Sequence, residues 1–462
     1  MTTRIESDTM GTIEVPKDRY WGAQTQRSLE NFKIGGHRFA PAVLHAFGVV
    51  KKAAALTNQR LKKLDDRRAD VIVRAADEVA RGLLDDHFPL VVWQTGSGTQ
   101  SNMNANEVIA SRANELLGIA LDAPRTERVV HPNDHVNMSQ SSNDVFPTVM
   151  HVAVATRLRQ RLLPSVELLK KAIEEKAIAF ADVVKIGRTH MMDATPLTLG
   201  QEMGGWASQL VFAERHLIEA LDGVHDLALG GTAVGTGLNA HPEWSVRVAE
   251  EIAHLTNMPF RTAPNKFAAL AAHDALVATS GATRLLATAC MKIGNDVRLL
   301  ASGPRAGLGE LVLPANEPGS SIMPGKVNPT QAEALTMVAA HVIGNDVAIG
   351  IAGASGHLEL NVFKPMIVHD LIESIELLSD ACDSFRTKCI EGVEPNRDAI
   401  ARHLASSLML VTALAPKIGY DAAAKIAKDA YARNVTLKEA AVASGLVSAA
   451  EFDGLVRPEK MV

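Results

Sequence analysis

The chain has 462 residues, of which 47% are hydrophobic, 21% charged and only 4% aromatic, and its formal net charge is −5. This composition is that of a globular protein with two or three domains. The sequence has no basic tract, which argues against nucleic-acid or membrane-surface binding as a main role, whereas a small anionic substrate stays possible because local charge matters more than the total. Few aromatic residues and abundant alanine favour packed helices over a β-sandwich.

The three cysteines, Cys290, Cys382 and Cys389, are widely spaced and form no C-x2-C pair, which argues against a zinc ribbon or an iron–sulfur cluster. Cys382 and Cys389 are predicted to be core thiols. An odd, low cysteine count indicates a reducing compartment. Residues 1–22 lack the charged-then-apolar pattern of a signal peptide, so we expect a cytoplasmic protein.

Residues 1–140 are predicted to form an N-terminal mixed, mostly helical domain. Alternating side chains over residues 4–8 and 12–15 indicate short strands. Helices are predicted over residues 41–61 and 66–83, and a third from about Asn102.

Residues 141–393 are predicted to form a central bundle of long helices. Apolar residues recur at helical spacing over 143–180, where Pro164 should kink or interrupt the helix. A second helix is predicted over 196–227, with Pro196 near its first turn. Further helices are predicted over 265–302, 329–353 and 369–392. Five long helices in succession favour a mainly α fold with an elongated central five-helix bundle.

The apolar segment 332–351 is long enough to raise the question of a membrane span. It contains Glu333, His341, Asn345 and Asp346, so it fits a buried bundle helix, and no membrane span is predicted. Residues 394–462 are predicted to form a small helical C-terminal domain.

The most informative stretch is residues 319–329, GSSIMPGKVNP, which lies between two predicted helices. Its glycines and prolines predict a loop that is partly permissive and partly fixed. Its hydroxyls, ammonium and amide suit a small dianion that is held while a proton is removed from carbon. On composition alone, a Gly/Pro surface loop with incidental polar residues is an equal alternative.

Three other polar stretches carry chemistry, and each has a plainer interpretation. Residues 95–104 alternate glycine and hydroxyl before a helix, which favours anions but also fits an ordinary N-cap loop. Residues 128–144 combine Arg, His, amides and serines, and are otherwise a solvated loop. Residues 185–196 contain His190 before a helix, a placement that is more often structural than catalytic. The glycine-rich tract 230–239 has no Gly-Lys-Ser/Thr ending, so nucleotide binding is not indicated.

Taken together, these stretches resemble the motifs of the fumarase/aspartase superfamily, and the resemblance covers essentially the whole chain. The GSSIMPGKVNP run looks like its signature loop. His190, Gly325 and the Ser97–Gly98–Thr99 arrangement are similar to class II, iron-independent fumarases, whereas aspartases usually carry Gln and Ala at the first two positions. The resemblance implies a mainly α, three-domain fumarase/aspartase-like fold.

The resemblance also implies the reaction, which is reversible anti addition of water to fumarate giving L-malate through an aci-carboxylate. It implies that Ser320 is the base, that His190 acts through a water and is tuned by Glu333, and that Lys326 and Asn328 stabilise the intermediate. The implied substrate-binding residues are Ser97, Gly98, Thr99, Ser141, Ser142, Asn143, Thr189, Ser321, Lys326, Val327 and Asn328. The implied secondary dicarboxylate site consists of Arg128, His131, Pro132, Asn133 and Asp134.

This chemistry needs no metal and no organic cofactor. By the same resemblance we expect a homotetramer in which each active site draws on three chains, with fumarate and L-malate as ligands. Two alternatives remain at this stage. One is an aspartate ammonia-lyase or another fumarate-releasing lyase of the same fold, and the other is a catalytically silent structural relative similar to the delta-crystallins.

Overall fold

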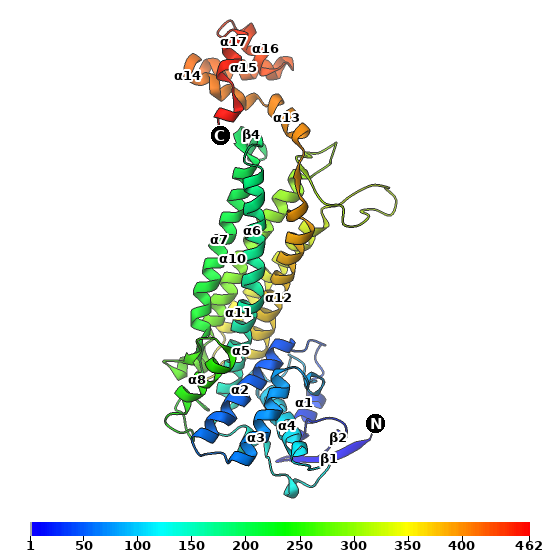
Figure 1. The fold of residues 1–462 in the computed structure, drawn as a ribbon, viewed down its shortest axis with the longest axis vertical. Coiled ribbons are helices and arrows are strands. Elements are labelled where there is room, and N and C mark those ends of the chain that lie inside the picture. Colours follow the sequence, from blue (N-terminus) through cyan, green and yellow to red (C-terminus); the bar gives the residue numbers. More distant parts are fainter. Residues whose placement is uncertain (1) are drawn as a thin grey trace. The chain divides into compact units, whose positions relative to one another are not determined.

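The computed structural model describes residues 2–462, which form seventeen α-helices and four two-stranded sheets (Figure 1). The chain groups into two compact units, each assembled from three separate segments. The first unit comprises Met1–Pro164, Arg215–Leu285 and His341–Leu378, and the second comprises Ser165–Glu214, Leu286–Ala340 and Ser379–Val462. The predicted division into consecutive domains at residues 140 and 393 stays a prediction, because these units interleave along the chain.

The first unit begins with an antiparallel hairpin of β1 (Thr3–Asp8) and β2 (Gly11–Pro16), which confirms the two predicted strands. Alternation along β1 places Arg4 and Glu6 in the interior. Arg4 donates to the carbonyl oxygens of residues 16, 19 and 21, so this buried cation fixes the path from the hairpin to α1 (Ala23–Asn31).

Helices α2 (Pro41–Arg60), α3 (Asp66–Ala80) and α4 (Thr99–Leu116) follow, as predicted. Helix α2 has a proline in its first turn, and the side chain of Asp65 caps α3 by accepting from the N–H of Arg68. The α2 and α3 backbones come very close together at Gly48, where an added Cβ would lie 2.2 Å from the backbone nitrogen of Ala80.

The predicted helix over 143–180 is interrupted, as Pro164 required. It consists of α5 (Ser142–Arg157), one π-turn (Leu158–Leu162) and α6 (Leu163–Ala179). Proline lacks the N–H that an uninterrupted helix needs, and the wider π-turn before it absorbs the missing hydrogen bond.

The next segment corrects the predicted helix start at Pro196. Strands β3 (Val184–Thr189) and β4 (Met192–Thr198) form an antiparallel hairpin, with Ile186 opposite Pro196, and α7 (Leu199–Val224) begins only after it. His190 and Met191 form the hairpin turn with φ of 56° and 64°. Two central residues with positive φ are the geometry that a two-residue hairpin turn requires.

The prediction of one uninterrupted helix over 265–302 was wrong. Helix α9 (Lys266–Ala271) ends at Ala272, which has an extended backbone, and α10 (Asp274–Leu300) starts afresh. The carbonyl groups at the end of α9 face another segment. The N–H of Asn361 donates to Leu270 O, and an added Cβ on Gly356 would lie 2.2 Å from Ala271 O.

Helices α11 (Thr330–Gly353) and α12 (Lys364–Lys388) match two of the predicted helices, although α12 starts before the predicted His369 because Pro365 is favourable in a first turn. By length and composition α11 could cross a membrane. Its Asp346, however, accepts a hydrogen bond of 2.7 Å from Ser280 Oγ and pairs with Arg284, so α11 is a bundle helix, as predicted. The predicted burial is not met within one chain, because only 28% of its most apolar window is buried.

Within the second unit, the long helices form a closed ring of contacts. Side-chain hydrogen bonds join α6 to α7, α7 to α10, α11 to α12 and α12 back to α6. Helix α10 approaches α11 closely at Gly294, where an added Cβ would lie 2.9 Å from Thr336 Cγ2. The pairs are Lys170–Glu214, Trp206–Asp296, Gly294–Thr336, Gln331–Ser384 and Asp383–Ser165.

The remaining short elements complete the two units. The first unit also contains α8 (Trp244–Thr256) and the parallel pair β5 (Asp226–Leu227) and β6 (Arg261–Thr262), while β7 (Leu311–Val312) pairs with β8 (Glu394–Pro395) in the second. The C-terminal region is helical, as predicted, and has a core of its own. Its helices are α13 (Arg397–Ser406), α14 (Ala415–Ile418), α15 (Tyr420–Arg433), α16 (Leu437–Ala443) and α17 (Ala449–Leu455).

The three cysteines are buried free thiols, which confirms the prediction for Cys382 and Cys389. A hydrogen bond with Cys290, together with burial, raises the pKa of the Cys382 thiol. Cys382 is therefore a protonated core thiol at neutral pH.

The close approach of α2 to α3 gives a test of the fold. We expect Gly48→Ala to lower the free energy of unfolding by about 1–3 kcal/mol, because the added methyl group forces two backbones apart. Gly454→Ala in α17 is the matched control, since an added Cβ there has nothing within 4 Å. Urea unfolding of both variants would measure the difference, and equal stability would contradict the packing described.

Candidate active site

The first segment predicted to bind an anion lies at the start of α4. Gly98 is the N-cap residue with φ of 77°, and an added Cβ would lie 2.2 Å from the ring of Phe146, so only glycine fits. Ser97 Oγ lies 2.8 Å from Thr99 Oγ1. The structure thus places the hydroxyls of Ser97 and Thr99 beside the N–H groups of a helix start, where an anion is favoured.

The second segment lies at the start of α5. Ser141 is the N-cap residue and forms a capping box with Asp144, whose Oδ1 accepts from the N–H of Ser141 over 2.8 Å. The side chain of Asn143 donates to the carbonyl oxygen of Ala233 over 2.8 Å. This contact joins the second segment to the glycine-rich tract 230–239.

The structure brings these two segments together. The amide of Asn102 in the first turn of α4 donates to Ser142 Oγ over 2.8 Å. Because the side chain of Phe146 also lies against Gly98, the first turns of α4 and α5 are neighbours, and their N-terminal dipoles act on the same region. The predicted carboxylate-binding residues of the first unit therefore form one cluster.

The signature loop belongs to the second unit and is closed at its neck. The N–H of Gly319 donates to Lys326 O over 2.8 Å, and the side-chain amide of Asn328 donates to Gly319 O over 2.6 Å. Gly319 must be glycine, because an added Cβ would lie 2.5 Å from Lys326 O. Gly325, with φ of 81°, turns the chain inside the loop.

Inside this loop, the hydroxyl oxygen of Ser320 accepts two backbone hydrogen bonds. The donors are the N–H groups of Ile322 at 3.3 Å and Met323 at 3.1 Å. Two donors aimed at one hydroxyl oxygen stabilise its deprotonated form more than its neutral form. The loop backbone therefore directs two donors at the Ser320 hydroxyl oxygen.

His190 lies at the tip of the β3–β4 hairpin and is exposed. A buried ionic network holds the base of this hairpin. Lys185 Nζ lies 3.1 Å from Glu310 Oε2, and Arg188 lies 2.6 Å from Glu310 Oε1. Burial raises the pKa of Glu310, but the contacts with Arg188 and Lys185 outweigh it and lower the pKa overall. Glu310 directly precedes β7, so the network links the hairpin to the chain leading into the signature loop.

The remaining predicted residues of the second unit lie on its surface. Within residues 2–462, no hydrogen bond or ion pair joins His190 to Glu333, although the sequence suggested this pairing. The exposed residues are Thr189, Ser321, Lys326, Val327 and Glu333. The predicted active-site residues are thus divided between the two units.

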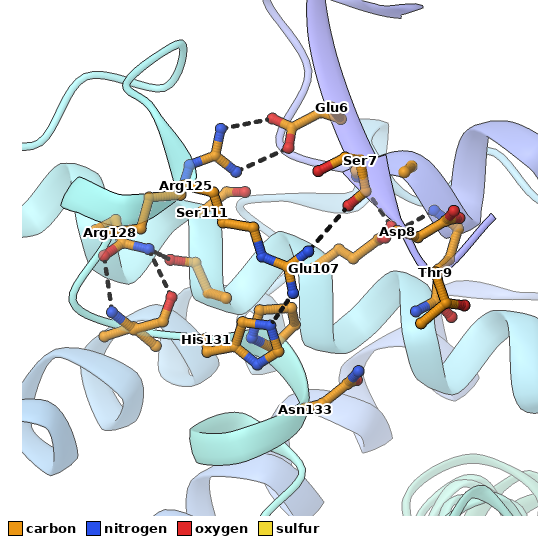
Figure 2. Close-up of a pocket in the computed structure, with 17 residues that line it drawn as sticks. Glu6, Ser7, Asp8, Thr9, Glu107, Ser111, Arg125, Arg128, His131 and Asn133 are labelled. Carbon is orange, nitrogen blue, oxygen red and sulfur yellow. Dashed lines mark hydrogen bonds and ion pairs between the residues drawn. The ribbon is translucent and has the colours of Figure 1, made fainter. Parts of the chain in front are cut away.

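The predicted secondary site lines a cavity of about 120 Å³ in the first unit (Figure 2). Figure 2 shows the side chains of Arg125 and His131 meeting there, with 2.6 Å between Arg125 Nη2 and His131 Nε2. Arg125 donates to Nε2, and the backbone N–H of Asp134 donates to Nδ1 over 3.2 Å, so a donor faces each ring nitrogen. The carboxylate oxygen Asp134 Oδ2 lies 3.1 Å from Nδ1. Burial lowers the pKa of His131, which Asp134 partly offsets.

Arg128 also lines this cavity, but it faces Glu6. Its two terminal nitrogens lie 2.8 and 2.9 Å from the Glu6 carboxylate oxygens, and its Nε donates to the carbonyl oxygen of Ala123. Arg4 contacts the same carboxylate at 2.8 Å. Most of the donors of Arg128 are therefore already engaged, whereas Arg125, which the sequence analysis did not select, lies next to His131.

Sequence reasoning missed three fully buried charged residues beside the first-unit cluster, namely Asp144, Lys51 and Lys364. The Ser141-x-x-Asp144 spacing is a capping-box signal that could have identified Asp144. No sequence pattern marks the two lysines, because isolated lysines are ordinarily exposed.

The comparisons with known proteins agree with this arrangement. A family model described as "Lyase" matches residues 11–344, and one described as "Fumarase C C-terminus" matches residues 410–462. The fold and the matched models define a mainly α lyase of the fumarase/aspartase type.

Similar full-length proteins narrow this class. "Fumarate hydratase class II" of Thermosynechococcus vestitus is 60% identical, covering 100% of this chain and 98% of its own. "Fumarate hydratase 1, mitochondrial" of Arabidopsis thaliana is 59% identical, covering 99% and 93%. The crystal structure of recombinant class II fumarase from Schistosoma mansoni has a TM-score of 0.97 at 44% identity, covering 100% of this chain and 99% of that one. The chain belongs to the class II fumarate hydratase family.

The Glu6–Arg128 pair gives a testable interaction energy. We expect Glu6→Gln to lower the free energy of unfolding by about 3 kcal/mol, because it removes the carboxylate that Arg4 and Arg128 share. Arg128→Gln should lower it less, because Arg4 still pairs with the Glu6 carboxylate. The double variant should lose less than the sum. Burial raises the pKa of Glu6, but Arg128 and Arg4 lower it overall. The contribution of the ionised Glu6 carboxylate to stability is therefore complete above its ordinary pKa of 4.5. It disappears as pH falls through the lowered pKa of the folded state.

Urea unfolding at pH 7 would measure this cycle. Asp122→Asn, which removes an exposed partner of Lys17, is the control and should change stability little. Additive losses in the Glu6/Arg128 double variant would show that the two side chains do not stabilise each other.

Proposed function

We propose that this chain hydrates fumarate to L-malate by reversible, stereospecific anti addition of water. The observation that carries the proposal is the pair of N–H groups on Ser320 Oγ, which suits a base that removes a proton from carbon. The full-length similarity to fumarate hydratases supports the same reaction. We include in this proposal that the enzyme acts in the tricarboxylic acid cycle.

The reaction in the malate-to-fumarate direction starts with loss of the C3 proton to the Ser320 alkoxide. The electron pair moves into the adjacent carboxylate and forms an aci-carboxylate with two negatively charged oxygens. Lys326 supplies a positive charge for these oxygens, and Asn328 supplies an N–H. The Asn328 amide has two N–H groups, and only one of them is used to close the loop neck.

The second half of the reaction expels the C2 hydroxyl. His190 acts on this side through an ordered water and delivers a proton, so hydroxide leaves as water and the double bond forms. Anti geometry requires that His190 and Ser320 act on opposite faces of the substrate. Glu333 tunes His190 in this scheme. The hydroxyls and amides at Ser97, Thr99, Ser141, Ser142 and Asn143 hold the substrate carboxylates.

We further propose a homotetramer whose active sites each draw on three chains. Two observations support it. The groups of the second unit assigned to catalysis or binding are largely exposed in one chain, and so are large apolar side chains on α7 and α11. These apolar residues are Val211, Phe212, Ile218, Met337, Val347 and Ile351.

Two finer assignments complete the proposal. A secondary dicarboxylate site would use His131, Pro132, Asn133 and Asp134, with Arg125 beside His131 as its nearer cation and Arg128 behind it. Cytoplasmic location also stays a proposal, since one similar protein carries the name mitochondrial.

An ultraviolet assay of fumarate's conjugated double bond tests the function. Purified protein with chelator should raise the absorbance with L-malate and not with L-aspartate. A rise with L-aspartate alone would assign an ammonia-lyase, and no change with either would leave the structural alternative or another succinyl substrate.

The two assigned catalytic residues are tested by substitution. We expect Ser320→Ala and His190→Asn each to lower kcat by about 10²–10⁴-fold while leaving the melting temperature unchanged, because His190 is exposed and Ser320 is only half-buried in its loop. His254→Asn in α8 is the exposed-histidine control and should keep full activity. Near-normal turnover by a folded Ser320→Ala protein would refute the base assignment.

Shared sites predict complementation between inactive variants. Ser320→Ala changes the second unit, and Asn143→Ala changes the first. When chains of both variants are mixed, unfolded and refolded together, some sites should receive intact residues from different chains, and activity should return to about a quarter of wild type or less if chains mix at random. Separately refolded variants are the control, and no recovery in verified mixed oligomers would contradict shared sites.

A further inference from the structure

Lys364, the first residue of α12, is fully buried and contacts both anion-binding segments of the first unit. Its backbone N–H donates to Gly96 O over 3.1 Å, immediately before Ser97. Its ammonium nitrogen lies 3.4 Å from Asn143 O. The acceptor of the ammonium is a neutral carbonyl oxygen, which does not neutralise the positive charge of the lysine.

The segment that delivers Lys364 is held tightly. An added Cβ on Gly96 would lie 1.4 Å from Val362 O, so these two backbones are in direct contact. The side chain of Asn361 donates to Ala352 O over 2.8 Å and accepts from the N–H of Phe363 over 2.8 Å. The position of the ammonium is therefore set by a buried, hydrogen-bonded turn rather than by a flexible side chain alone.

The surrounding charges leave an excess of positive charge. The buried carboxylate is Asp144, and three backbone N–H groups, those of Ser141, Gly230 and Thr232, already donate to it. A second buried lysine, Lys51, donates to the side-chain oxygens of Asn137 and Gln140, each over 2.9 Å. Asp144 attracts both ammonium groups electrostatically, so two buried lysines share one carboxylate beside the segments assigned to the substrate carboxylates.

Burial is costly for this ammonium, and a dianion would offset the cost. Burial lowers the pKa of Lys364 to about 7, which the nearby Asp144 opposes. An added negative charge close by stabilises the charged form. A buried cation whose hydrogen-bond acceptor is a neutral carbonyl oxygen, and whose nearby carboxylate already accepts three N–H groups, is poorly compensated until an anion arrives.

We propose that Lys364 is a positioning residue for the dicarboxylate, which fixes the spacing of the Gly96–Thr99 and Ser141–Asn143 segments and supplies positive charge that selects a dianion. This inference rests on the proposed function, because it assigns the dianion to the same cluster. A purely structural lysine would hold the segments without preferring two negative charges over one.

The test compares a dianion with a monoanion of similar shape. Succinate and its monoamide, succinamate, are measured as ligands of the full-length protein by calorimetry and by inhibition of turnover. Lys364→Met should weaken succinate binding about ten-fold or more and raise KM for fumarate similarly, with a smaller change in kcat. Succinamate binding should weaken less. Lys428→Met, an exposed lysine of α15, is the control and should change neither ligand.

Lys364→Gln is the second variant, because its side-chain amide keeps an N–H donor for Asn143 O while the positive charge is removed. Circular dichroism and thermal melting establish that each variant is folded. Equal weakening of succinate and succinamate in a folded variant would overturn the proposal, as would affinities within about two-fold of wild type. Loss of folding in both variants would assign Lys364 to the core and overturn the proposal too.

Binding and turnover separate this inference from the proposed reaction. A wild-type protein that binds succinate through Lys364 but does not hydrate fumarate would contradict the reaction and retain the dianion preference. Hydration of fumarate with no change in the succinate-to-succinamate ratio in Lys364→Gln would retain the reaction and contradict the role of Lys364.

Discussion

The buried carboxylate of Asp144 is the interaction on which the first unit's part of the site depends. It accepts the N–H of Ser141 at the start of α5 and the N–H groups of Gly230 and Thr232 in the glycine-rich tract. Burial raises its pKa to about 6, although these hydrogen bonds oppose the rise. A single carboxylate thus fixes the helix start that presents the Ser141–Asn143 segment, and nearby lysines supply the positive charge.

In the second unit, hydrogen bonds and buried charges likewise fix the segments that carry the reacting groups. The signature loop uses its own backbone to direct two N–H groups at the Ser320 hydroxyl, and Asn328 closes its neck. The Glu310 network fixes the base of the hairpin that carries His190. The buried charges fix the backbone geometry. The groups assigned to the chemistry are exposed or half-buried in a turn and a loop, where a substrate or another chain can reach them.

Much of this could be predicted from the sequence, because local signals were strong. Helical periodicity and proline placement gave the long helices and the break before Pro164, and the eleven-residue run 319–329 identified the loop. The β3–β4 hairpin was missed because its turn, His190–Met191, contains no glycine or asparagine to signal positive φ. The break at Ala272 and the buried Lys364 depend on contacts with distant segments, which periodicity does not report.

Hydration of fumarate in deuterium oxide tests the central claim most directly. With Ser320 and His190 acting on opposite faces, proton NMR should show L-malate with one deuterium at C3, in the single diastereomer that anti addition produces, and the Ser320→Ala protein should form it far more slowly. A mixture of C3 diastereomers, the product of addition to one face, or an unchanged rate for Ser320→Ala would contradict the account.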